Sequence, residues 1–225
     1  MDRVVDEPRF RERIRVFEDR FHAGRLLAKM LQRHVQLEDA LLFAIPAGGV
    51  PVGYVISGEL HLPMDVIIVR KIQVPWDPEA GFGAISWDGE VVLNEYLVKH
   101  LGLTHDIIQE SIEKTMEVIR ERFRKFRAER PMPIVRDRTA ILVDDGLASG
   151  YTMLAAVKSM KKRKPKKIVV AVPTASMNAV ELLSKEIDDL LCLNIRSGLI
   201  FAVADAYKNW RDLTDQEVMK LLKKT

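Results

Sequence analysis

Residues 140–153 read Ala140-Ile141-Leu142-Val143-Asp144-Asp145-Gly146-Leu147-Ala148-Ser149-Gly150-Tyr151-Thr152-Met153, and this stretch decides the fold. A short apolar run of this kind is typical of a strand that is buried on both faces of a parallel sheet. The small-residue turn between two glycines, followed by Thr152, indicates that a helix begins directly after the strand. Because open α/β sheets bind their ligands beyond the carboxyl ends of the strands, we expect the functional site in this turn.

The turn has the properties of a phosphate site. Backbone N–H groups from Ala148 to Thr152 can point inward at the start of the helix, where unpaired donors and the helix dipole favour an anion. The preceding carboxylates of Asp144 and Asp145 would repel a bare phosphate. They indicate a ligand that carries hydroxyl groups or a metal ion one sugar-width from its phosphate. The alternative, a polar turn with Ser149 as a helix cap, does not account for the whole unbroken order.

The same run resembles the 5-phosphoribosyl-1-pyrophosphate (PRPP) motif of type I phosphoribosyltransferases. That motif has four hydrophobic residues, two acids, two small or apolar residues, Ala or Asp, Ser or Thr, Gly, any residue, and Thr or Ser, and every position fits. Three competing motifs, G-x-x-x-x-G-K-[ST], G-x-G-x-x-G and G-x-S-x-G, do not occur in the sequence. The segments 17–24 and 201–210 resemble an uncharacterised group of phosphoribosyltransferase-domain proteins.

Predicted strands and helices alternate along the chain, which indicates an α/β fold with a doubly wound, mostly parallel sheet. We expect a single domain over 1–225, with its core over about 41–193. Strands are expected at 41–45, 64–69, 140–143, 168–172 and 190–193, and helices at 52–60, 152–162, 176–185 and from 214 onward. The remaining expected parts are an N-terminal helix over 10–35, an irregular lid over about 72–92, a long inserted helix over about 104–130, and a small hood or tail over 194–225.

Two further segments follow predicted strands. Gly48 and Gly49 permit a close backbone approach to a ligand, and successive N–H groups there can form an anion-binding nest. This segment resembles the family's pyrophosphate loop, although Ala47 stands where the family often has Arg or Lys. Arg70 and Lys71 follow the second strand, and the resemblance implies that a lysine, which we assign as Lys71, contacts pyrophosphate. The alternatives are an ordinary strand-to-helix turn and an exposed strand end.

The resemblance implies a reaction, namely transfer of the 5-phosphoribosyl group of PRPP to a nitrogen base such as a purine or pyrimidine, with release of pyrophosphate. Asp144 and Asp145 would hold the ribose hydroxyls and, through water, the Mg²⁺ cofactor, and with Lys71 they form the expected catalytic set. The expected substrate-binding residues are Ala47, Gly48, Gly49, Arg70, Gly146, Ala148, Ser149, Gly150, Tyr151 and Thr152.

The acceptor base stays open at this point. Some purine-salvage members of the family carry a third Asp, acting as general base, where this chain has Ala148. A base would therefore come from the lid, where Asp77 and Glu79 are candidates, or from the acceptor itself. Aromatic residues that could stack on the acceptor, or simply pack in the core, are Phe201, Tyr207 and Trp210.

Composition limits the class of protein. The chain is 48% hydrophobic and 30% charged with a net charge of +3, which is typical of an ordinary globular protein. No apolar run approaches the roughly 18 residues of a membrane span, and the charged N-terminus does not resemble a signal peptide. A lone cysteine excludes a disulfide framework, and the histidines lack the spacing of a zinc site. We therefore expect a cytoplasmic protein without a membrane partner.

Two partner hypotheses remain. Seven basic residues lie between Lys158 and Lys167, and they support an alternative function as a non-catalytic PRPP-sensing regulator that binds RNA. Nucleic acid is nevertheless not the expected partner, because no aromatic residues are interleaved with these charges. The apolar stripe along residues 104–130 is typical of core packing and would equally suit a dimer seam, and we expect a homodimer.

Overall fold

The central feature of the fold is a six-stranded sheet in which all neighbouring strands are parallel. The computed structural model describes residues 4–127, 130–198 and 200–224, leaving aside the side chains of residues 78 and 79. The strands of this sheet are β1 (Val4–Asp6), β2 (Ala40–Ala44), β3 (Met64–Val66), β7 (Thr139–Val143), β8 (Lys167–Ser176) and β9 (Asp189–Arg196). They lie in the order β1-β9-β8-β7-β2-β3. The expected α/β fold with a mostly parallel sheet is confirmed.

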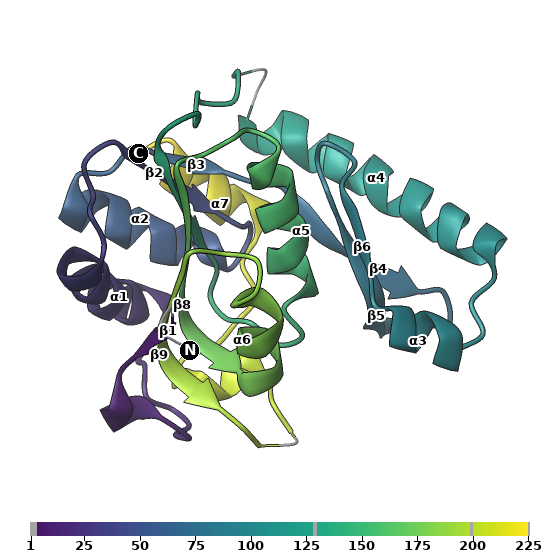
Figure 1. Ribbon diagram of the computed structural model, residues 1–225, viewed down its shortest axis with the longest axis horizontal. Coiled ribbons are helices and arrows are strands. Elements are labelled where there is room, and N and C mark those ends of the chain that lie inside the picture. The colour runs from purple at the N-terminus through teal and green to yellow at the C-terminus, as the bar shows by residue number, and fades with distance from the viewer. Residues whose placement is uncertain (1–3, 128–129, 199, 225) are drawn as a thin grey trace.

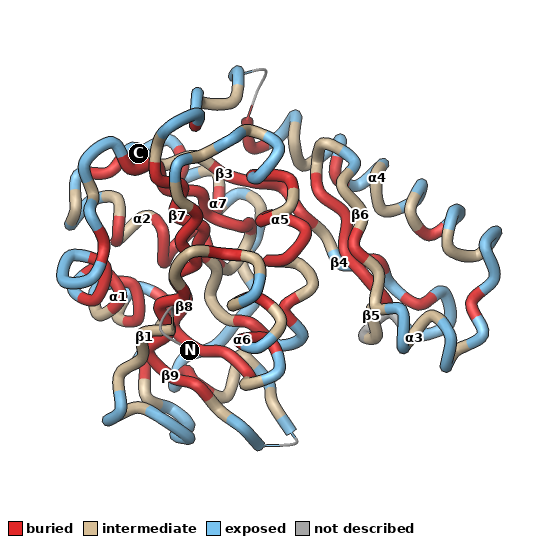
Figure 2. The backbone as a smooth tube through the Cα atoms, viewed as in Figure 1, coloured by how far each residue is buried: buried red, intermediate tan, exposed pale blue. Residues whose placement is uncertain are grey.

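Helices cover both faces of this sheet, which explains its apolar strands. Every residue of β2 and β7 is buried. Helices α1 (Arg20–His34) and α2 (Gly49–Leu60) pack on one face, and α5 (Tyr151–Lys161) and α6 (Met177–Leu183) pack on the other (Figure 1). The strands between them form the most deeply buried part of the chain (Figure 2). No helix in the described ranges is both long and apolar enough to cross a membrane.

A second, antiparallel sheet stands apart from the first. It consists of β4 (Val69–Val74), β5 (Asp77–Ser86) and β6 (Val91–Leu93) in the order β4-β5-β6. Together with α3 (Glu95–His100) and α4 (His105–Arg127) it forms an arm, residues 69–127, that projects from the body of the molecule (Figure 1). The expected inserted helix corresponds to α4.

The apolar stripe of α4 packs against the arm's own sheet. Ile119 and Phe126 on this stripe are almost fully buried, and they join a cluster with Ile72 and Phe82 of the sheet. The stripe therefore packs against the core of the arm, as the first of the two interpretations expected. The homodimer itself stays a prediction.

Arg127 anchors the end of α4 to the main sheet. Its buried guanidinium forms an ion pair with Asp65 and donates hydrogen bonds to the carbonyl oxygens of Val66 (3.2 Å) and Pro131 (3.0 Å). A charged group can stay buried only when it is paired in this way. The arm is thus fixed to β3 at its base.

The prediction of an irregular lid over 72–92 is wrong, because most of this segment belongs to strands β4 to β6. Buried and exposed residues alternate from Lys71 to Val74, as in a half-buried strand. The glycines serve close packing between strands here, since a β-carbon added to Gly83 would lie 2.4 Å from the carbonyl oxygen of Val92. Glycine and proline had suggested a loop where the chain instead forms a tightly paired hairpin.

The strand expected over 64–69 is divided between the two sheets. Its first part is β3 of the main sheet, whereas Val69 already begins β4 of the arm. Arg70 and Lys71 consequently belong to the first strand of the arm, opposite Ile85 and Ala84 of β5. The sequence suggested that these two residues follow the end of a strand, whereas they lie within β4.

The N-terminal helix expected over 10–35 begins only at Arg20. Asp19 is its N-cap, and its Oδ1 accepts a hydrogen bond of 2.7 Å from the amide of His22. The preceding chain contains the short 3-10 helix η1 (Pro8–Phe10) and positive φ angles at Glu12 and Arg15, which are incompatible with a continuous helix. Two of the expected helical residues differ sharply in burial, because Phe17 is fully buried while Ile14 is exposed.

The C-terminal segment crosses back over the carboxyl edge of the main sheet. It contains the 3-10 helix η2 (Val203–Ala206) and ends in α7 (Asp215–Leu222), which contacts α2 and α4. Thr214 and Glu217 form a reciprocal capping box at the start of α7. The expected capped helix after Thr214 is therefore confirmed.

Candidate functional site

The candidate site lies around Asp144 and Asp145, which directly follow β7. The order of strands places the loop after β2 on one side of this acidic pair and the loop after β8 on the other. A β-carbon added to Gly48 would lie 1.9 Å from Oδ2 of Asp145, and one added to Gly49 would lie 2.9 Å from Cα of Asp144. Only glycine therefore allows the loop after β2 to approach the acidic pair this closely.

Arg20, the first residue of α1, holds the carboxylate of Asp145. Its Nε donates to Oδ2 of Asp145 at 2.8 Å, and its Nη1 donates to the carbonyl oxygen of Arg211 at 2.9 Å. The two side chains are only 9% and 13% exposed. The guanidinium also lies 3.8 Å from the ring centroid of Trp210, at a distance suited to a cation–π interaction. Arg20 thus joins the N-terminal helix, the acidic pair and the C-terminal segment.

The two carboxyl groups of the pair share one partly buried environment. Burial raises the pKa of Asp144 well above its ordinary value, and the negative charge of Asp145 raises it further. Burial also raises the pKa of Asp145, but the charge and hydrogen bond of Arg20 act against this increase. Asp144 is consequently the member of the pair that retains a proton more readily.

The backbone around the pair is fixed by further hydrogen bonds. The hydroxyl of Tyr207 donates to the carbonyl oxygen of Asp145 at 2.6 Å, and the amide of Asp145 donates to Oδ1 of Asp144 at 2.8 Å. A β-carbon added to Gly146 would lie 2.5 Å from Cγ1 of Val203. The C-terminal segment therefore packs directly on the chain that follows the acidic residues.

The loop that leads into α5 exposes unpaired donors. Leu147 pairs with the end of β8, and Ser176 Oγ donates to the carbonyl oxygen of Ala148 at 2.6 Å. Gly150 takes a φ of 82° as the residue before α5, a conformation that favours glycine. In the described part of the chain, the amides of residues 148–151 donate no hydrogen bond. They form the kind of helix-start site that binds anions.

A cavity of about 570 Å³ opens between the body of the molecule and the arm. The body contributes the loop 46–48, in which the peptide bond between Pro46 and Ala47 is cis, together with Asp145 and the C-terminal segment. The arm contributes Arg70, Lys71 and Arg122. The cavity therefore combines the loop after β2, the carboxylates of Asp145 and Asp212, and a set of cations.

The structure brings together most of the residues that the sequence suggested. Ala47, Gly48, Arg70, Lys71 and Asp145 line the same cavity. Asp144, Gly49 and Gly146 are sequence neighbours of residues that line the cavity. Residues 148–152 form a separate segment at the start of α5. Their proposed roles remain proposals.

Three residues of the site were not assigned there by the sequence. Arg20 and Arg122 lie on helices whose pattern indicated only packing, and Tyr207 was considered as an aromatic ring but not as a hydrogen-bond donor. The helix cap at Asp19 was the one local signal that could have placed Arg20 at the start of a helix. Nothing local indicated Arg122.

The three aromatic candidates for contact with an acceptor have different positions. Tyr207 is buried among core residues, and Phe201 packs beneath the guanidinium of Arg196 at 5.1 Å. Trp210 is 37% exposed and lines both the site cavity and an adjoining cavity of about 480 Å³. Phe21, with a similar exposure, lines the adjoining cavity as well. Trp210 is the candidate whose position still suits a ligand.

The two residues expected to supply lid carboxylates, Asp77 and Glu79, belong to the first part of β5 in the β4–β5 hairpin. Asp77 begins β5 and accepts a hydrogen bond of 3.3 Å from the amide of Ala80. It is not among the residues that line the site cavity. The side chain of Glu79 lies outside the described part of the structure.

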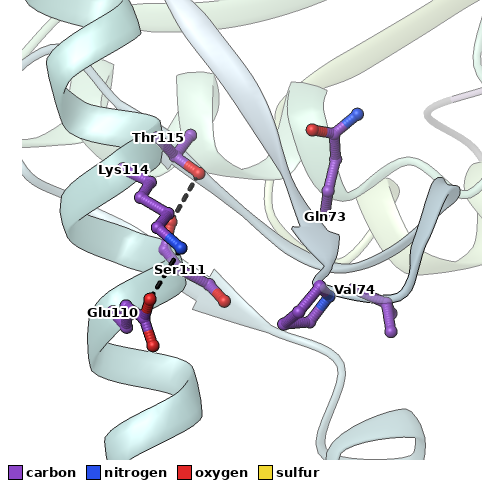
Figure 3. Close-up of a pocket in the computed structure, with 7 residues that line it drawn as sticks. Gln73, Val74, Glu110, Ser111, Lys114 and Thr115 are labelled. Atoms are coloured by element: carbon purple, nitrogen blue, oxygen red, sulfur yellow. Dashed lines mark hydrogen bonds and ion pairs between the residues drawn. The ribbon is translucent and has the colours of Figure 1, made fainter.

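A separate, smaller cavity of about 230 Å³ lies within the arm between β4 and α4 (Figure 3). Among the described residues on its wall, Lys114 is the one cation, and it pairs with Glu110 at 2.6 Å. Thr115 donates to the carbonyl oxygen of Ser111 at 2.7 Å. Because Lys114 is already paired, the described wall of this cavity is less suited to a charged ligand than the cavity beside Asp145.

The basic cluster after α5 is largely engaged within the chain. Lys161 pairs with Glu186 (2.6 Å), Lys162 with Glu90 (2.8 Å) and Lys167 with Asp189 (2.5 Å). Arg163 lies 4.8 Å from the ring centroid of Trp87. These contacts favour a solvated helix end over an RNA-binding surface.

The donor set does not suggest a metal held by the protein alone. Among the described residues, no group of three or more His, Cys, Asp or Glu side chains could hold a metal ion. Two carboxylates beside an anion site nevertheless fit Mg²⁺, which keeps several waters and uses one or two carboxylates together with substrate phosphates.

Comparison with known proteins gives consistent matches. The model of the family described as "Phosphoribosyl transferase domain" matches residues 18–207. Two proteins from strains of Mycobacterium tuberculosis, named "Putative phosphoribosyl transferase MT0597" and "Putative phosphoribosyl transferase Rv0571c", are each 36% identical over 211 residues, which are 93% of this chain and 47% of theirs. The chain thus spans about half the length of these curated relatives.

Solved structures share the fold. The protein TT1426 from Thermus thermophilus superposes with a TM-score of 0.74 and 32% sequence identity, covering 92% of this chain and 98% of that chain. A hypothetical protein from Neisseria gonorrhoeae with bound ppGpp has a TM-score of 0.50 and 15% identity, covering 96% and 97% of the two chains. The second likeness concerns the fold alone.

Proposed function

Because this chain belongs to the phosphoribosyl transferase family, we propose that it transfers the 5-phosphoribosyl group of PRPP to a nitrogen base and releases pyrophosphate. One observation carries the proposal, namely that the acidic pair lies between two anion-competent segments: the loop after β2 contacts the pair, and the amides of residues 148–151, which follow it in the chain, donate no hydrogen bond in the described structure. PRPP has a phosphate at one end, a pyrophosphate at the other, and two ribose hydroxyls between them. The arrangement of the site matches the order of these groups.

Each part of the site has a role in this proposal. Asp144 and Asp145 accept hydrogen bonds from the ribose hydroxyls, and Arg20 orients the Asp145 carboxylate and favours its ionised form. The amides of residues 148–151 bind the 5-phosphate. The loop 46–49 binds the pyrophosphate through backbone donors, because Ala47 offers no charge.

Mg²⁺ would enter with the substrate, held by its pyrophosphate and by Asp144 and Asp145 through water. When bound, it would neutralise the leaving group. The raised pKa values of the acidic pair support such a site, since a cation would favour ionised carboxylates there. Ala148 supplies no general base, so the attacking nitrogen would have to be nucleophilic without help from that loop.

The test measures pyrophosphate release from PRPP and Mg²⁺ in the presence of a panel of nitrogen bases. Release that depends on one base would support the transferase and identify its acceptor. Binding of PRPP without release under any base would instead favour the PRPP-sensing regulator. Absence of PRPP binding would overturn both hypotheses.

A further inference from the structure

We propose that Arg122 of α4 binds the pyrophosphate end of the substrate together with Arg70, so that the arm completes an anion site begun by the loop 46–48. This inference rests on the proposed function, because it identifies the bound anion as pyrophosphate. Helix α4 is an insertion into the core fold, and its arginine lies outside the motifs that identify the family.

The position of Arg122 carries the first part of the argument. It lies on the last turns of α4 and lines the same cavity as the loop 46–48, Arg70 and Asp145. Its side chain is 26% exposed, and its guanidinium lies 5.9 Å from the ring centroid of Phe126. The guanidinium therefore lies beside a buried ring of the arm's core, on a residue that lines the cavity.

The charge balance of this wall carries the second part. Among the described residues, no carboxylate lies within ion-pair distance of the Arg70 guanidinium. Burial lowers the pKa of Arg70, the positive charge of Arg122 lowers it further, and Asp215 opposes this effect. Two like-charged guanidiniums on one cavity wall repel each other until an anion binds between them. A planar guanidinium pair suits phosphate oxygens particularly well.

Asp215 gives the alternative explanation for Arg122. This first residue of α7 lies 3.7 Å from Arg122 and 2.5 Å from Lys125. Arg122 could thus serve only to dock α7 on α4. The shorter contact belongs to Lys125, however, so Asp215 is already neutralised by a residue that does not line the cavity. Docking alone does not require a second cation directed at the loop 46–48.

The two explanations predict opposite results for two variants. We would titrate inorganic pyrophosphate, with and without Mg²⁺, into the wild-type protein and the variants Arg122→Gln and Asp215→Asn. Loss of a charge-assisted contact in Arg122→Gln should weaken binding by about tenfold or more. Asp215→Asn removes a negative charge near both arginines and should strengthen pyrophosphate binding by about two- to threefold.

Two further variants control the comparison. Arg124→Gln changes an exposed arginine of the same helix and should leave pyrophosphate binding unchanged. Arg122→Lys keeps the charge without the planar fork and should retain part of the affinity. Unfolding temperatures of all variants would establish that each one folds.

The proposal is overturned if Arg122→Gln binds pyrophosphate as tightly as the wild type, or if Asp215→Asn weakens binding to the same extent as Arg122→Gln. Both readouts use pyrophosphate and not turnover. A protein that bound pyrophosphate through Arg122 but never acted on PRPP would refute the proposed function while leaving this anion site in place. If the wild-type protein turned over PRPP and Arg122→Gln bound pyrophosphate with unaltered affinity, the proposed function would stand and the role of Arg122 would be refuted.

Discussion

Replacing Gly48 with alanine should disrupt the site through a single added methyl group. The new β-carbon would lie 1.9 Å from Oδ2 and 2.3 Å from Cγ of Asp145. Because carbon–oxygen contacts normally begin at about 3.3 Å, the carboxylate has to move by about 1.4 Å. Arg20 donates to the same Oδ2 at 2.8 Å, and a displacement of this size lengthens that bond beyond hydrogen-bond distance.

The cost follows from the burial of the ion pair. Breaking a buried pair by removing one partner costs about 3–5 kcal/mol. In Gly48→Ala both charges remain and the carboxylate can turn toward water in the cavity, so we expect a loss of about 2–3 kcal/mol. For a chain of this length the unfolding temperature should fall by about 5–10 °C. PRPP affinity should fall by at least about 100-fold, because the Asp145 acceptor leaves its position.

Gly58→Ala is the matched control for this change. Gly58 lies in α2, the helix that begins directly after Gly48, and a β-carbon there would meet nothing within 4 Å. This variant should gain about 0.5–1 kcal/mol of stability from helix propensity and bind PRPP normally. Thermal unfolding and calorimetric titration of both variants test the reasoning. Wild-type stability and PRPP affinity in Gly48→Ala would refute it.

Three further predictions concern charges. Asp144→Asn should stabilise the protein at neutral pH by about 1–3 kcal/mol, because ionising a partly buried carboxyl with a raised pKa costs folding free energy. This gain in stability should vanish at low pH, where the carboxyl is protonated in both the folded and the unfolded state. Chemical denaturation at a series of pH values measures it. Glu217, whose pKa is lowered to about 2 chiefly by Arg211, stabilises the fold above the ordinary glutamate pKa. The stability deficit of Glu217→Gln should therefore shrink as the pH falls toward about 2, and a constant deficit would contradict this assignment. Replacing four residues of the basic cluster by serine should leave PRPP turnover intact and cause no loss of RNA binding. Turnover assays and salt-dependent RNA titrations of the variant would measure both. These four residues are Lys161, Lys162, Arg163 and Lys164.

Most of the main sheet could be predicted because the central strands contain apolar runs that are followed by turn residues, whereas the short edge strand β1, with the sequence Val-Val-Asp, was not expected. The stretch from Ala140 to Thr152 contained a complete local pattern, and the observed β7, loop and α5 follow it closely. Helix caps at Ser176 and Thr214 were likewise visible, since capping depends on residues within one turn.

The arm could not be predicted in the same way. Its strands contain Gly81 and Gly83, which normally signal a loop, and their function in packing depends on partners elsewhere in the hairpin. The register of β4 and β5 also shifts near Gln73, which interrupts the alternation. Local sequence therefore indicated the wrong element where pairing decided the structure.

The ion pair in the site was invisible for a related reason. Arg20 and Asp145 are separated by 125 positions, and no local pattern joins an arginine on an amphipathic helix to a carboxylate in a turn. Arg122 is similar, because a charged residue on a long helix normally faces solvent. The sequence indicated the candidate residues in the loops of the site, but neither Arg20, which holds the Asp145 carboxylate, nor Arg122 on the cavity wall.

Calorimetric titration of PRPP with Mg²⁺ into the wild-type protein and the double variant Asp144→Asn/Asp145→Asn tests the central claim most directly. The wild type should bind PRPP, and the folded double variant should not. A double variant that unfolds cooperatively and still binds PRPP with wild-type affinity would contradict the assignment of the acidic pair and, with it, the proposed site.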